Sequence, residues 1–430
     1  MRKTLAALCA AALVGAVAAA PAGATNGMEM IGTNPRSTGM GGADVAADSD
    51  AAAVSGNPAL ICGCAPSSAS IGVTALMPKL GMTNMGGAND IEGENQVFAM
   101  PQLGYVHRIG GTPFTVGFGL YAQGGMGVDF KGVNTGMGTK DHLMSEVSFM
   151  RLNPMVAYRA TEDLTLGATV MVGYARMKFS FFPETYSPGF DGTPGTGDDF
   201  AGMRVRDLSS FGVAGRIGAQ YKLGPQVRLG ATYTTKTDLK MDDGTATLNF
   251  GQMKTDYDAK MDDFTWPQEV EFGVAYLPIT GLTLAADVKW INWSDAVKVP
   301  KLKLSSPDSG FAPQNLEADF AMHWDDQWVF AIGAEYLITP AQALRVGYNF
   351  GKSPVPDAYL NPLFPAIVEQ HLTVGYGYTM GQWVFDLAYE HAFEKTQRND
   401  NLNMMENPFG PGLEVSHSQN TVAASVTYRY

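Results

Sequence analysis

The sequence lacks any long hydrophobic run beyond its first 24 residues, and it is poor in charge and in cysteine. Without about 20 consecutive apolar residues, no transmembrane helix is expected. Charged residues make up 17% of the 430 residues and the net charge is −13, which excludes the basic footprint of a nucleic-acid partner. The 6 histidines have no paired spacing, and no nucleophile or phosphate-binding motif occurs. We therefore expect no enzyme, no metal and no cofactor.

Glycine, in contrast, is abundant. It accounts for 50 of the 430 residues, whereas about 7% is usual. Because glycine weakens helices, a helical bundle is disfavoured.

The first 24 residues form an export signal. Arg2 and Lys3 precede an apolar stretch over 5–20, and Ala22-Gly23-Ala24 supplies a cleavage site. A membrane anchor is the alternative, but this stretch is short for a span. The mature chain is expected to begin at Thr25 and to cross the inner membrane of a Gram-negative cell.

Hydrophobic residues then alternate with polar or small residues to the last residue. At the C-terminus Val422, Ala424 and Val426 fall on one face, and the intervening Ser425 and Thr427 fall on the other. The same period of two recurs upstream as far as Leu164. Period-two alternation predicts half-buried β-strands.

Two architectures alternate in this way, the soluble β-sandwich and the membrane barrel. The runs here are longer than the usual strand of about 5–6 residues, and aromatic residues gather at their ends, as in the girdles of membrane barrels. The polar faces also carry charges that a sandwich core would not accept: Glu269, Glu271, Asp287, Glu335, Arg345 and Asp386. The sequence therefore predicts an all-β fold, a transmembrane antiparallel β-barrel with about 14 strands and charges facing its lumen.

Connections between the strands alternate between long and short. The predicted strands are 66–79, 96–109, 113–123, 146–160, 163–182, 206–222, 225–242, 266–277, 281–294, 326–338, 342–350, 368–380, 382–393 and 417–430. The long connections are 80–95, 124–145, 183–205, 243–265, 295–325, 351–367 and 394–416. Long extracellular loops and short periplasmic turns are typical of outer-membrane barrels with an even strand number.

Residues 25–65 fit no strand and are rich in small residues. Such a segment is either a disordered leader or a plug packed in the lumen. With Asn57-Pro58-Ala59 it resembles the N-terminal hatch of the FadL-type transporters of long-chain fatty acids and hydrocarbons. The expected division is a signal peptide over 1–24, a hatch over 25–65 and the barrel over 66–430.

The resemblance continues along the barrel. Segments similar to strands of that family are 267–276, 286–294, 345–356 and 371–376, together with the terminal Tyr430. Cys62 and Cys64 depart from the family pattern. A zinc site is disfavoured because further ligands are missing, and a disulfide between them would be strained.

The resemblance implies passive uptake of hydrophobic compounds. In the family a hatch plugs the lumen, the ligand arrives from outside, and a kink in the third strand opens a lateral exit. Glycine permits such breaks in a strand, although a glycine-rich loop start is the alternative. The candidates for the kink are Gly117, Gly119, Gly124, Gly125 and Gly127.

Methionine adapts to varied apolar ligands, and five methionines cluster near the third and fourth strands. These methionines either line a ligand pocket, or they face lipid or occupy loops without a role in binding. These residues are Met126, Met137, Met144, Met150 and Met155.

The partners expected for such a protein are a hydrophobic small molecule, outer-membrane lipid with lipopolysaccharide, and the barrel-assembly machinery, and we expect a monomer. Alternatives are a general diffusion porin, which needs an open lumen, a surface receptor or adhesin barrel, and an outer-membrane enzyme. No nucleophile motif accompanies His391 and His417 to support the enzyme.

Loop 183–205 contains a candidate calcium-binding turn. Acidic and glycine residues over 191–199 resemble simple calcium-binding turns, but no EF-hand spacing is met and a solvated turn is favoured.

The charge of the long loops bears on the choice of ligand. These loops carry most of the net negative charge. An acidic mouth repels a fatty carboxylate, which slightly favours neutral hydrocarbons. Acidic loops that bridge lipopolysaccharide phosphates through divalent cations are the competing explanation, and Lys254 or Lys260 could still hold a carboxylate.

Overall fold

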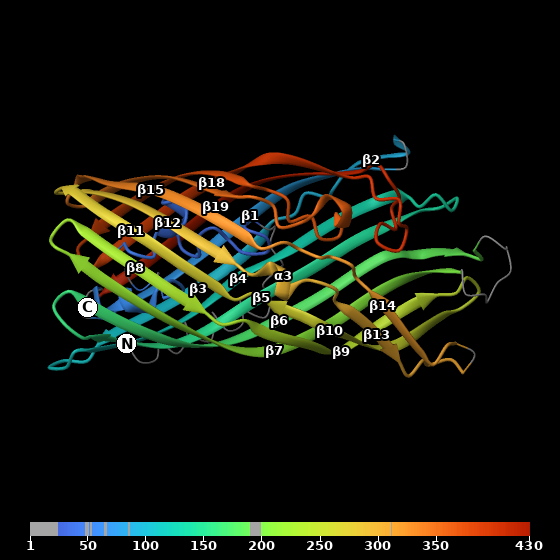
Figure 1. Ribbon diagram of the computed structural model, residues 1–430, viewed down its shortest axis with the longest axis horizontal. Coiled ribbons are helices and arrows are strands. Elements are labelled where there is room, and N and C mark those ends of the chain that lie inside the picture. Colours follow the sequence, from blue (N-terminus) through green and yellow to red (C-terminus); the bar gives the residue numbers. More distant parts are fainter. Residues whose placement is uncertain are drawn as a thin grey trace.

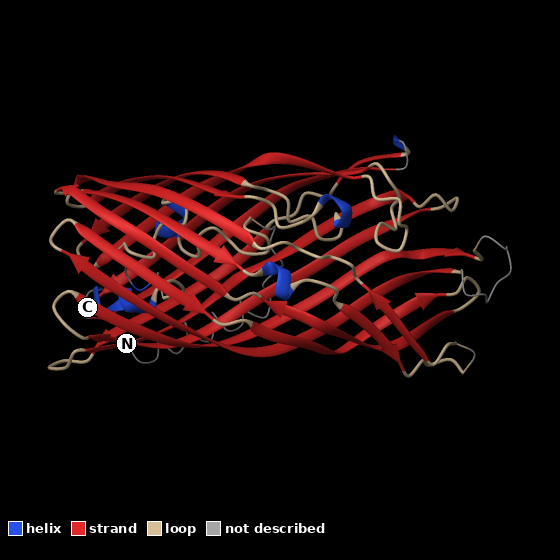
Figure 2. Cartoon of the chain, viewed as in Figure 1, coloured by secondary structure: helices blue, strands red, loops and turns tan. Residues whose placement is uncertain are grey.

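A computed structural model describes residues 25–47, 51, 54–63, 67–84, 87–189, 199–310 and 312–430. Figure 1 shows these residues as a long barrel of tilted strands, and Figure 2 shows that helices are few and short. Among the described residues, no helix is long and apolar enough to cross a membrane. The predicted signal peptide, Cys64 and most of the acidic turn over 191–199 lie outside the described residues.

The barrel closes by antiparallel pairing of its first and last strands, with Ala75 opposite Val422. Within the described residues, nineteen strand segments belong to one sheet. They are β1 (Ser67–Asn84), β2 (Asn89–Glu92), β3 (Phe98–Arg108), β4 (Phe114–Asn134), β5 (Lys140–Arg159), β6 (Leu164–Ser187), β7 (Phe200–Leu223), β8 (Val227–Thr234), β9 (Thr237–Asn249), β10 (Lys254–Trp266), β11 (Glu269–Ile279), β12 (Leu282–Ile291), β13 (Lys301–Ser305), β14 (Asn315–Asp319), β15 (Gln327–Thr339), β16 (Gln342–Gly351), β17 (Gln370–Met380), β18 (Trp383–Asn399) and β19 (Leu413–Arg429).

Several segments combine into single barrel strands. β7 pairs with both β8 and β9, and β8 and β9 pair in turn with β11 and β10. In the same way, β12 pairs with β15, while β13 pairs with β14. β2 is a short addition beside the outer end of β1. The described segments thus form a closed barrel of fourteen strands, and the predicted fold is confirmed.

The two faces of the wall differ as the alternation predicts. Outward-facing apolar side chains are exposed, among them Phe211 at 75% and Trp328 at 56%. Inward-facing polar side chains are buried, including Glu335 and Asp386. The prediction that these charges face the lumen is confirmed. A sheet whose outer face meets lipid requires this polarity.

Periplasmic turns are tight, and four of them place a glycine at positive φ: Gly111, Gly224, Gly281 and Gly381. At the other end, two of the predicted loops are much too long. Loop 124–145 shrinks to 135–139, because β4 continues to Asn134 and β5 begins at Lys140. Loop 243–265 shrinks to 250–253. The outward faces of these strand extensions need not meet lipid and carry charged residues such as Lys254 and Asp256, so a search for lipid-facing apolar residues does not reveal them.

The described residues of 25–63 lie inside the barrel and form an inner segment, which includes the helix α2 (Pro35–Gly39) and the 3₁₀ helix η2 (Pro58–Gly63). Most of its described residues are buried. Where it packs against the wall, many of the facing wall residues are glycines. A Cβ at these positions would collide with the segment. The wall glycines at this interface are Gly104, Gly119, Gly124, Gly167, Gly218, Gly230, Gly333, Gly347 and Gly375. The high glycine content therefore has a structural role in the close packing of 25–63.

Two further short helices lie at the outer half of the barrel. α3 (Trp293–Ala296) interrupts the barrel strand between β12 and β13, and the 3₁₀ helix η4 (Asp357–Tyr359) belongs to the connection between β16 and β17. Figure 2 shows both as short blue segments among the strands.

Candidate binding pocket and lumen path

Ion pairs fix α2 to the wall. Arg36 donates two hydrogen bonds to the carboxylate of Glu335, at 3.1 and 2.8 Å. The same carboxylate accepts from Arg345 at 2.7 Å, and Arg345 also donates to Asp386 at 2.6 Å. Because these charges are buried, each requires its partner. The predicted lumen charges Glu335, Arg345 and Asp386 therefore form the ion-pair network that binds Arg36 of the inner segment.

The Asn57-Pro58-Ala59 motif connects three pieces of chain. The Asn57 side-chain amide donates to the carbonyl of Val45 at 2.9 Å and to the carbonyl of Ala219, in β7, at 3.0 Å. Its oxygen accepts from the N–H of Ala59 at 3.0 Å. Pro58 begins η2, where a proline fits because the first turn has no N–H partner to lose.

Cys62 ends up against the wall beside this motif. Its side chain is buried, and its carbonyl accepts from Arg108 at 3.0 Å and from Arg159 at 2.9 Å. Among the described residues, no group of three or more His, Cys, Asp or Glu side chains could hold a metal ion.

The wall is interrupted between β3 and β4. Their ladder runs from Arg108 opposite Thr115 to Gln102 opposite Tyr121 and stops there. The next residue of β3 is Pro101, which has no N–H to donate. Farther along, the N–H of Glu94 donates to the carbonyl of Asp129 at 2.8 Å. Between these points β4 continues to pair with β5, with a register shift between Ala122 and Gly124.

The candidate kink glycines fall on both sides of this interruption. Gly117 and Gly119 lie within the β3–β4 ladder, whereas Gly124, Gly125 and Gly127 lie beyond it and pair only with β5. The structure therefore brings three of the five glycines to the break, and it places the other two below it.

The start of the inner segment closes the break from the lumen side. Glu29 forms an antiparallel bridge with Gly124, and the N–H of Gly125 donates to the carbonyl of Met28 at 3.0 Å. The Glu29 carboxylate accepts from the indole N–H of Trp266 at 2.8 Å. Burial, together with the nearby charge of Glu269, raises the pKa of Glu29 to about 8.

The five candidate methionines do not line a single pocket. Met126 packs with Met28 and Phe149 in the large apolar cluster of the lumen, and Met150 packs with Phe98 and Met100 near the break. Met155 lies in a cluster with Ile61, Cys62 and Val106. Met144 is half-buried in a register position opposite Asp129 and Ser180. Met137 lines the pocket described next.

An apolar pocket of about 740 Å³ lies at the extracellular end. Its described lining comes from the end of β1, the β4–β5 turn, the outer ends of β6 and β7 and the β18–β19 connection. None of the described residues that line it is charged. They are Asn84, Asn134, Thr135, Gly136, Met137, Phe181, Phe182, Ser187, Gly189, Phe200, Met404, Pro408, Phe409, Gly410 and Pro411.

Four phenylalanines form the aromatic part of this pocket. The ring centroids of Phe181 and Phe182 lie 4.9 Å apart, and the Phe409 ring meets that of Phe181 edge-on at 5.5 Å. Phe182 also has a φ of 47°, which is strained for a residue with a Cβ and is held by its surroundings. These rings form a rigid surface for a flat or apolar ligand.

Below the pocket, the apolar surface continues into the lumen. Phe182 and Phe409 belong to the same buried cluster as Met126, Trp266 and, at the inner segment, Met28. A chain of aromatic contacts runs through this cluster. The Phe149 and Trp266 rings are tilted with centroids 4.6 Å apart, and Trp293 meets both Trp266 and Trp324 edge-on. One cluster of buried apolar side chains thus extends from the extracellular pocket to Met28 in the inner segment.

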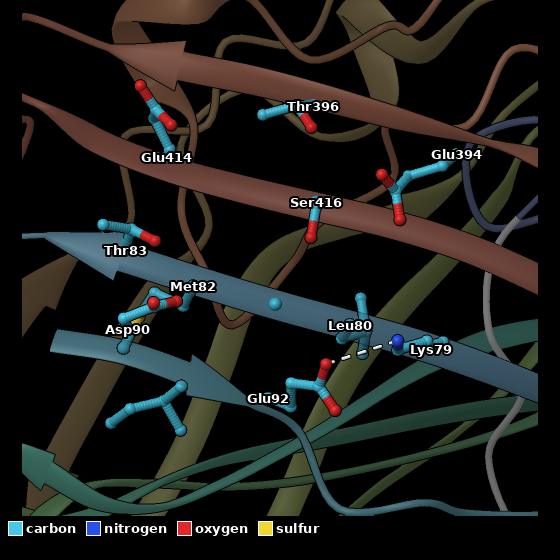
Figure 3. A pocket seen from close by; sticks show the side chains of 12 residues that line it. Lys79, Leu80, Met82, Thr83, Asp90, Glu92, Glu394, Thr396, Glu414 and Ser416 are labelled. Atoms are coloured by element: carbon cyan, nitrogen blue, oxygen red, sulfur yellow. Dashed lines mark ion pairs between the residues drawn. The ribbon is translucent and has the colours of Figure 1, made fainter.

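A second pocket of about 280 Å³ lies among β1, β2, β18 and β19 and is strongly polar. Figure 3 shows Asp90, Glu92, Glu394 and Glu414 around it, with Lys79 paired to Glu92 at 3.3 Å. Lys79 and Glu92 are exposed. This pocket is unsuited to an apolar ligand, and its carboxylates would repel an anion.

Sequence reasoning did not identify the aromatic pocket. A signal was present, since Ser180-Phe181-Phe182 and Pro408-Phe409-Gly410-Pro411 place bulky apolar residues at or within the predicted extracellular loops. Exposed loops rarely carry such residues without a binding role.

Comparison with known proteins now identifies the family. Residues 12–430 match the family model described as outer membrane protein transport protein (OMPP1/FadL/TodX). The chain belongs to this family. No curated protein matches the chain by sequence.

Solved structures share the fold. The toluene transporter TodX of Pseudomonas putida is 22% identical with a TM-score of 0.77, over 94% of this chain and 100% of that one. The toluene transporter TbuX of Ralstonia pickettii is 22% identical with a TM-score of 0.73, over 93% and 98%. A FadL homologue of Pseudomonas aeruginosa is 18% identical with a TM-score of 0.74, over 94% and 99%.

Membership of this family establishes three points. The chain is an outer-membrane barrel, it is a transport protein, and it is not an enzyme. The predicted family, location and general role are confirmed.

Proposed function

We propose that this chain is a channel for neutral hydrophobic compounds, in particular small aromatic hydrocarbons. The observation that supports this most is the uncharged aromatic pocket at the extracellular end, which joins a buried apolar cluster reaching the inner segment. Capture then needs no energy source, because each CH₂ removed from water contributes about 0.8 kcal/mol. The two toluene transporters with the same fold agree with this ligand class.

The charge distribution favours a neutral ligand over a fatty carboxylate. Within the described part of the chain, no lysine or arginine lines the aromatic pocket, so a carboxylate bound there would be desolvated without a counter-ion from these residues. The polar pocket in Figure 3 adds four carboxylates and one lysine at the same end of the barrel. An anionic ligand would therefore meet repulsion outside the channel and no counter-ion among the described residues of the aromatic pocket.

We further propose that the ligand leaves laterally between β3 and β4. The missing ladder beyond Gln102 and Tyr121 supports this route, as does the apolar lining of Phe98, Met100 and Met150 beside it. In this proposal residues 25–63 act as the hatch. Release requires the turn over 25–30 to move, because Met28 and Glu29 now bond to the free edge of β4.

A general diffusion porin is the alternative, and the interior of the barrel argues against it. The inner segment is fixed by buried ion pairs and by Asn57, and a large apolar cluster lies beyond it. A water-filled pore would need a polar, open lumen along its length.

Binding of three ligands to the purified protein tests the proposal. A monoaromatic hydrocarbon, a long-chain fatty acid and its methyl ester are compared at low and high ionic strength. We expect the hydrocarbon and the ester to bind at both, and the free acid to bind more weakly at low salt. Stronger binding of the free acid at low salt would show that neutral ligands are not selected.

Two variants locate the site. Phe409→Ala removes a pocket ring that is 6% exposed, whereas Phe330→Ala removes a ring on the lipid-facing surface that is 52% exposed. We expect hydrocarbon affinity to fall about tenfold or more in the first, from lost burial, and to stay unchanged in the second. Equal affinities in both variants would place the ligand elsewhere.

A further inference from the structure

The connection between β16 and β17, residues 352–369, does not extend outward as predicted for an extracellular loop. It folds into the lumen. Its apolar side chains are nearly all inaccessible, with Ile367 at 0%, Leu363 at 1% and Phe364 at 4% exposure. All three belong to the large apolar cluster of the lumen.

Its sequence explains how an irregular segment can be buried. Lys-Ser-Pro-Val-Pro-Asp-Ala-Tyr-Leu-Asn-Pro-Leu-Phe-Pro-Ala-Ile-Val-Glu contains prolines at 354, 356, 362 and 365. Each proline removes an N–H that would need a partner. The carbonyls instead accept from wall side chains: Gln397 donates to Val355 at 2.7 Å, and Asn399 donates to Ala358 at 3.1 Å and to Leu360 at 3.2 Å.

The segment crosses the whole lumen. It leaves the wall at β16 and returns at β17, but the hydroxyl of Ser145, in β5, donates to the carbonyl of Leu363. Five strands separate β5 from β17 on one side of the barrel, counted along the described pairings from β4 and β3 through β1 and β19 to β18. His417, in β19, also lies 3.1 Å from the carbonyl of Pro365.

This position coincides with the path of the proposed ligand. Leu363, Phe364 and Ile367 share one buried cluster with Phe182 and Phe409, which line the extracellular pocket, and with Met28 at the inner segment. The segment is also joined to the tryptophans that meet edge-on, because the N–H of Asp325, beside Trp324, donates to the carbonyl of Pro354 at 2.7 Å. An apolar ligand that moves from the pocket to the inner segment would have to replace these side chains.

We propose that, in the empty channel, Leu363, Phe364 and Ile367 fill the lumen site that the hydrophobic ligand takes, so that these three side chains determine which ligand sizes fit. The inference rests on the proposed function. When the ligand enters, its apolar surface replaces the apolar surface of these three side chains against the same lumen walls. Discrimination between ligands then depends on the shape that the segment leaves.

The test uses the full-length protein and alkylbenzenes of increasing alkyl length. Phe364→Ala removes a ring from the lumen without touching a hydrogen bond, and Phe330→Ala on the lipid-facing surface is the matched control. We expect Phe364→Ala to shift the preferred ligand to a longer alkyl chain, with about tenfold tighter binding of the longest members. The control should keep the order of affinities found for the unsubstituted protein.

A second variant reports movement of the segment. Ala366→Cys, placed in a Cys62→Ser and Cys64→Ser background, introduces a thiol at a position that is 1% exposed. We expect a small maleimide added from outside to label it slowly without ligand and several-fold faster at saturating alkylbenzene.

The outcomes separate the two levels of the account. If the unsubstituted protein binds the alkylbenzenes, while Phe364→Ala keeps the order of affinities and Ala366→Cys labels no faster with ligand, the role of the segment is wrong and the channel stands. If the unsubstituted protein binds none of them, the proposed function fails and this inference fails with it.

Discussion

The main-chain N–H of Gly125 donates a 3.0 Å hydrogen bond to the carbonyl of Met28, where β4 has already separated from β3. A strand edge that would otherwise be unpaired within the wall is thus satisfied from inside the lumen. An unpaired edge facing lipid costs several kcal/mol per group. The inner segment and the wall break are therefore mutually dependent.

Removal of residues 25–60 from the mature chain tests that dependence. The strands alone can close the barrel, so we expect a folded protein. The lumen around Glu335 and Arg345 becomes water-filled, and single-channel conductance in a planar bilayer should rise. Uptake of hydrocarbon should lose its selectivity. Conductance equal to that of the intact protein would show that residues 25–60 are not what closes the lumen to ions.

Substitution of Asn57 tests the motif in the inner segment. Asn57→Asp keeps the shape but loses the amide that donates to Val45 and Ala219. Leaving those buried carbonyls unpaired costs about 1–3 kcal/mol each. Hydrogen exchange measured by mass spectrometry should become faster over residues 40–63. Asn315→Ala on exposed β14 is the control and should change nothing, whereas unchanged exchange in Asn57→Asp would contradict the predicted role.

The wall glycines provide a third test. A Cβ on Gly347 would collide with the backbone of Met40 and Gly41, whereas a Cβ on Gly215 would have its nearest neighbour at 3.9 Å. We expect Gly347→Ala to displace α2 and to speed proteolysis within residues 25–63. Gly215→Ala should behave as the unsubstituted protein does. The packing argument fails if the two variants are cut at the same rate.

The fourth prediction concerns pH. The pKa of Glu29 is about 8 when the inner segment is docked, against 4.5 in water. A raised pKa means that docking of the inner segment favours the protonated form of Glu29. The contribution of Glu29 to docking stability is therefore complete below pH 4.5 and declines as the pH rises to about 8. Between these values the opening equilibrium should increase about tenfold per pH unit, then level off. Arg151 and Lys289 oppose this effect, while Glu269 reinforces it.

Hydrogen exchange at Gly125, corrected for the intrinsic pH dependence, measures this opening. Glu29→Gln is the matched control, because a neutral amide can still accept from Trp266 but cannot ionise. We expect the pH dependence in the unsubstituted protein and its loss in the variant. The same slope in both would assign the titration to another group.

Alternation in the sequence predicts the barrel strands where one face of the wall meets lipid and the other faces the lumen. Along β17, Leu372, Val374 and Tyr376 face lipid while Thr373 faces the lumen, so period two is enforced. Above the membrane this constraint ends. In β10, Lys254, Asp256 and Asp258 point outward and are exposed, while the residues between them are buried. The segment was predicted as a loop because its outward face is charged rather than apolar.

The candidate site could be predicted only in part. Asn57 and Gly124 are visible as local motifs, whereas the aromatic pocket combines residues near 137, 182 and 409 that meet only when the barrel closes. The inward course of 352–369 was likewise hidden, although its four prolines and apolar residues are unusual for a solvated loop. Long-range closure, rather than local propensity, creates both features.

Initial uptake of a labelled monoaromatic hydrocarbon tests the central claim most directly. Cells whose outer membrane contains this chain are compared with otherwise identical cells without it, at low hydrocarbon concentration, with a small hydrophilic sugar as the second label. The account predicts faster hydrocarbon uptake with no change for the sugar. Equal hydrocarbon rates in the two cells, or a parallel rise for the sugar, would contradict it.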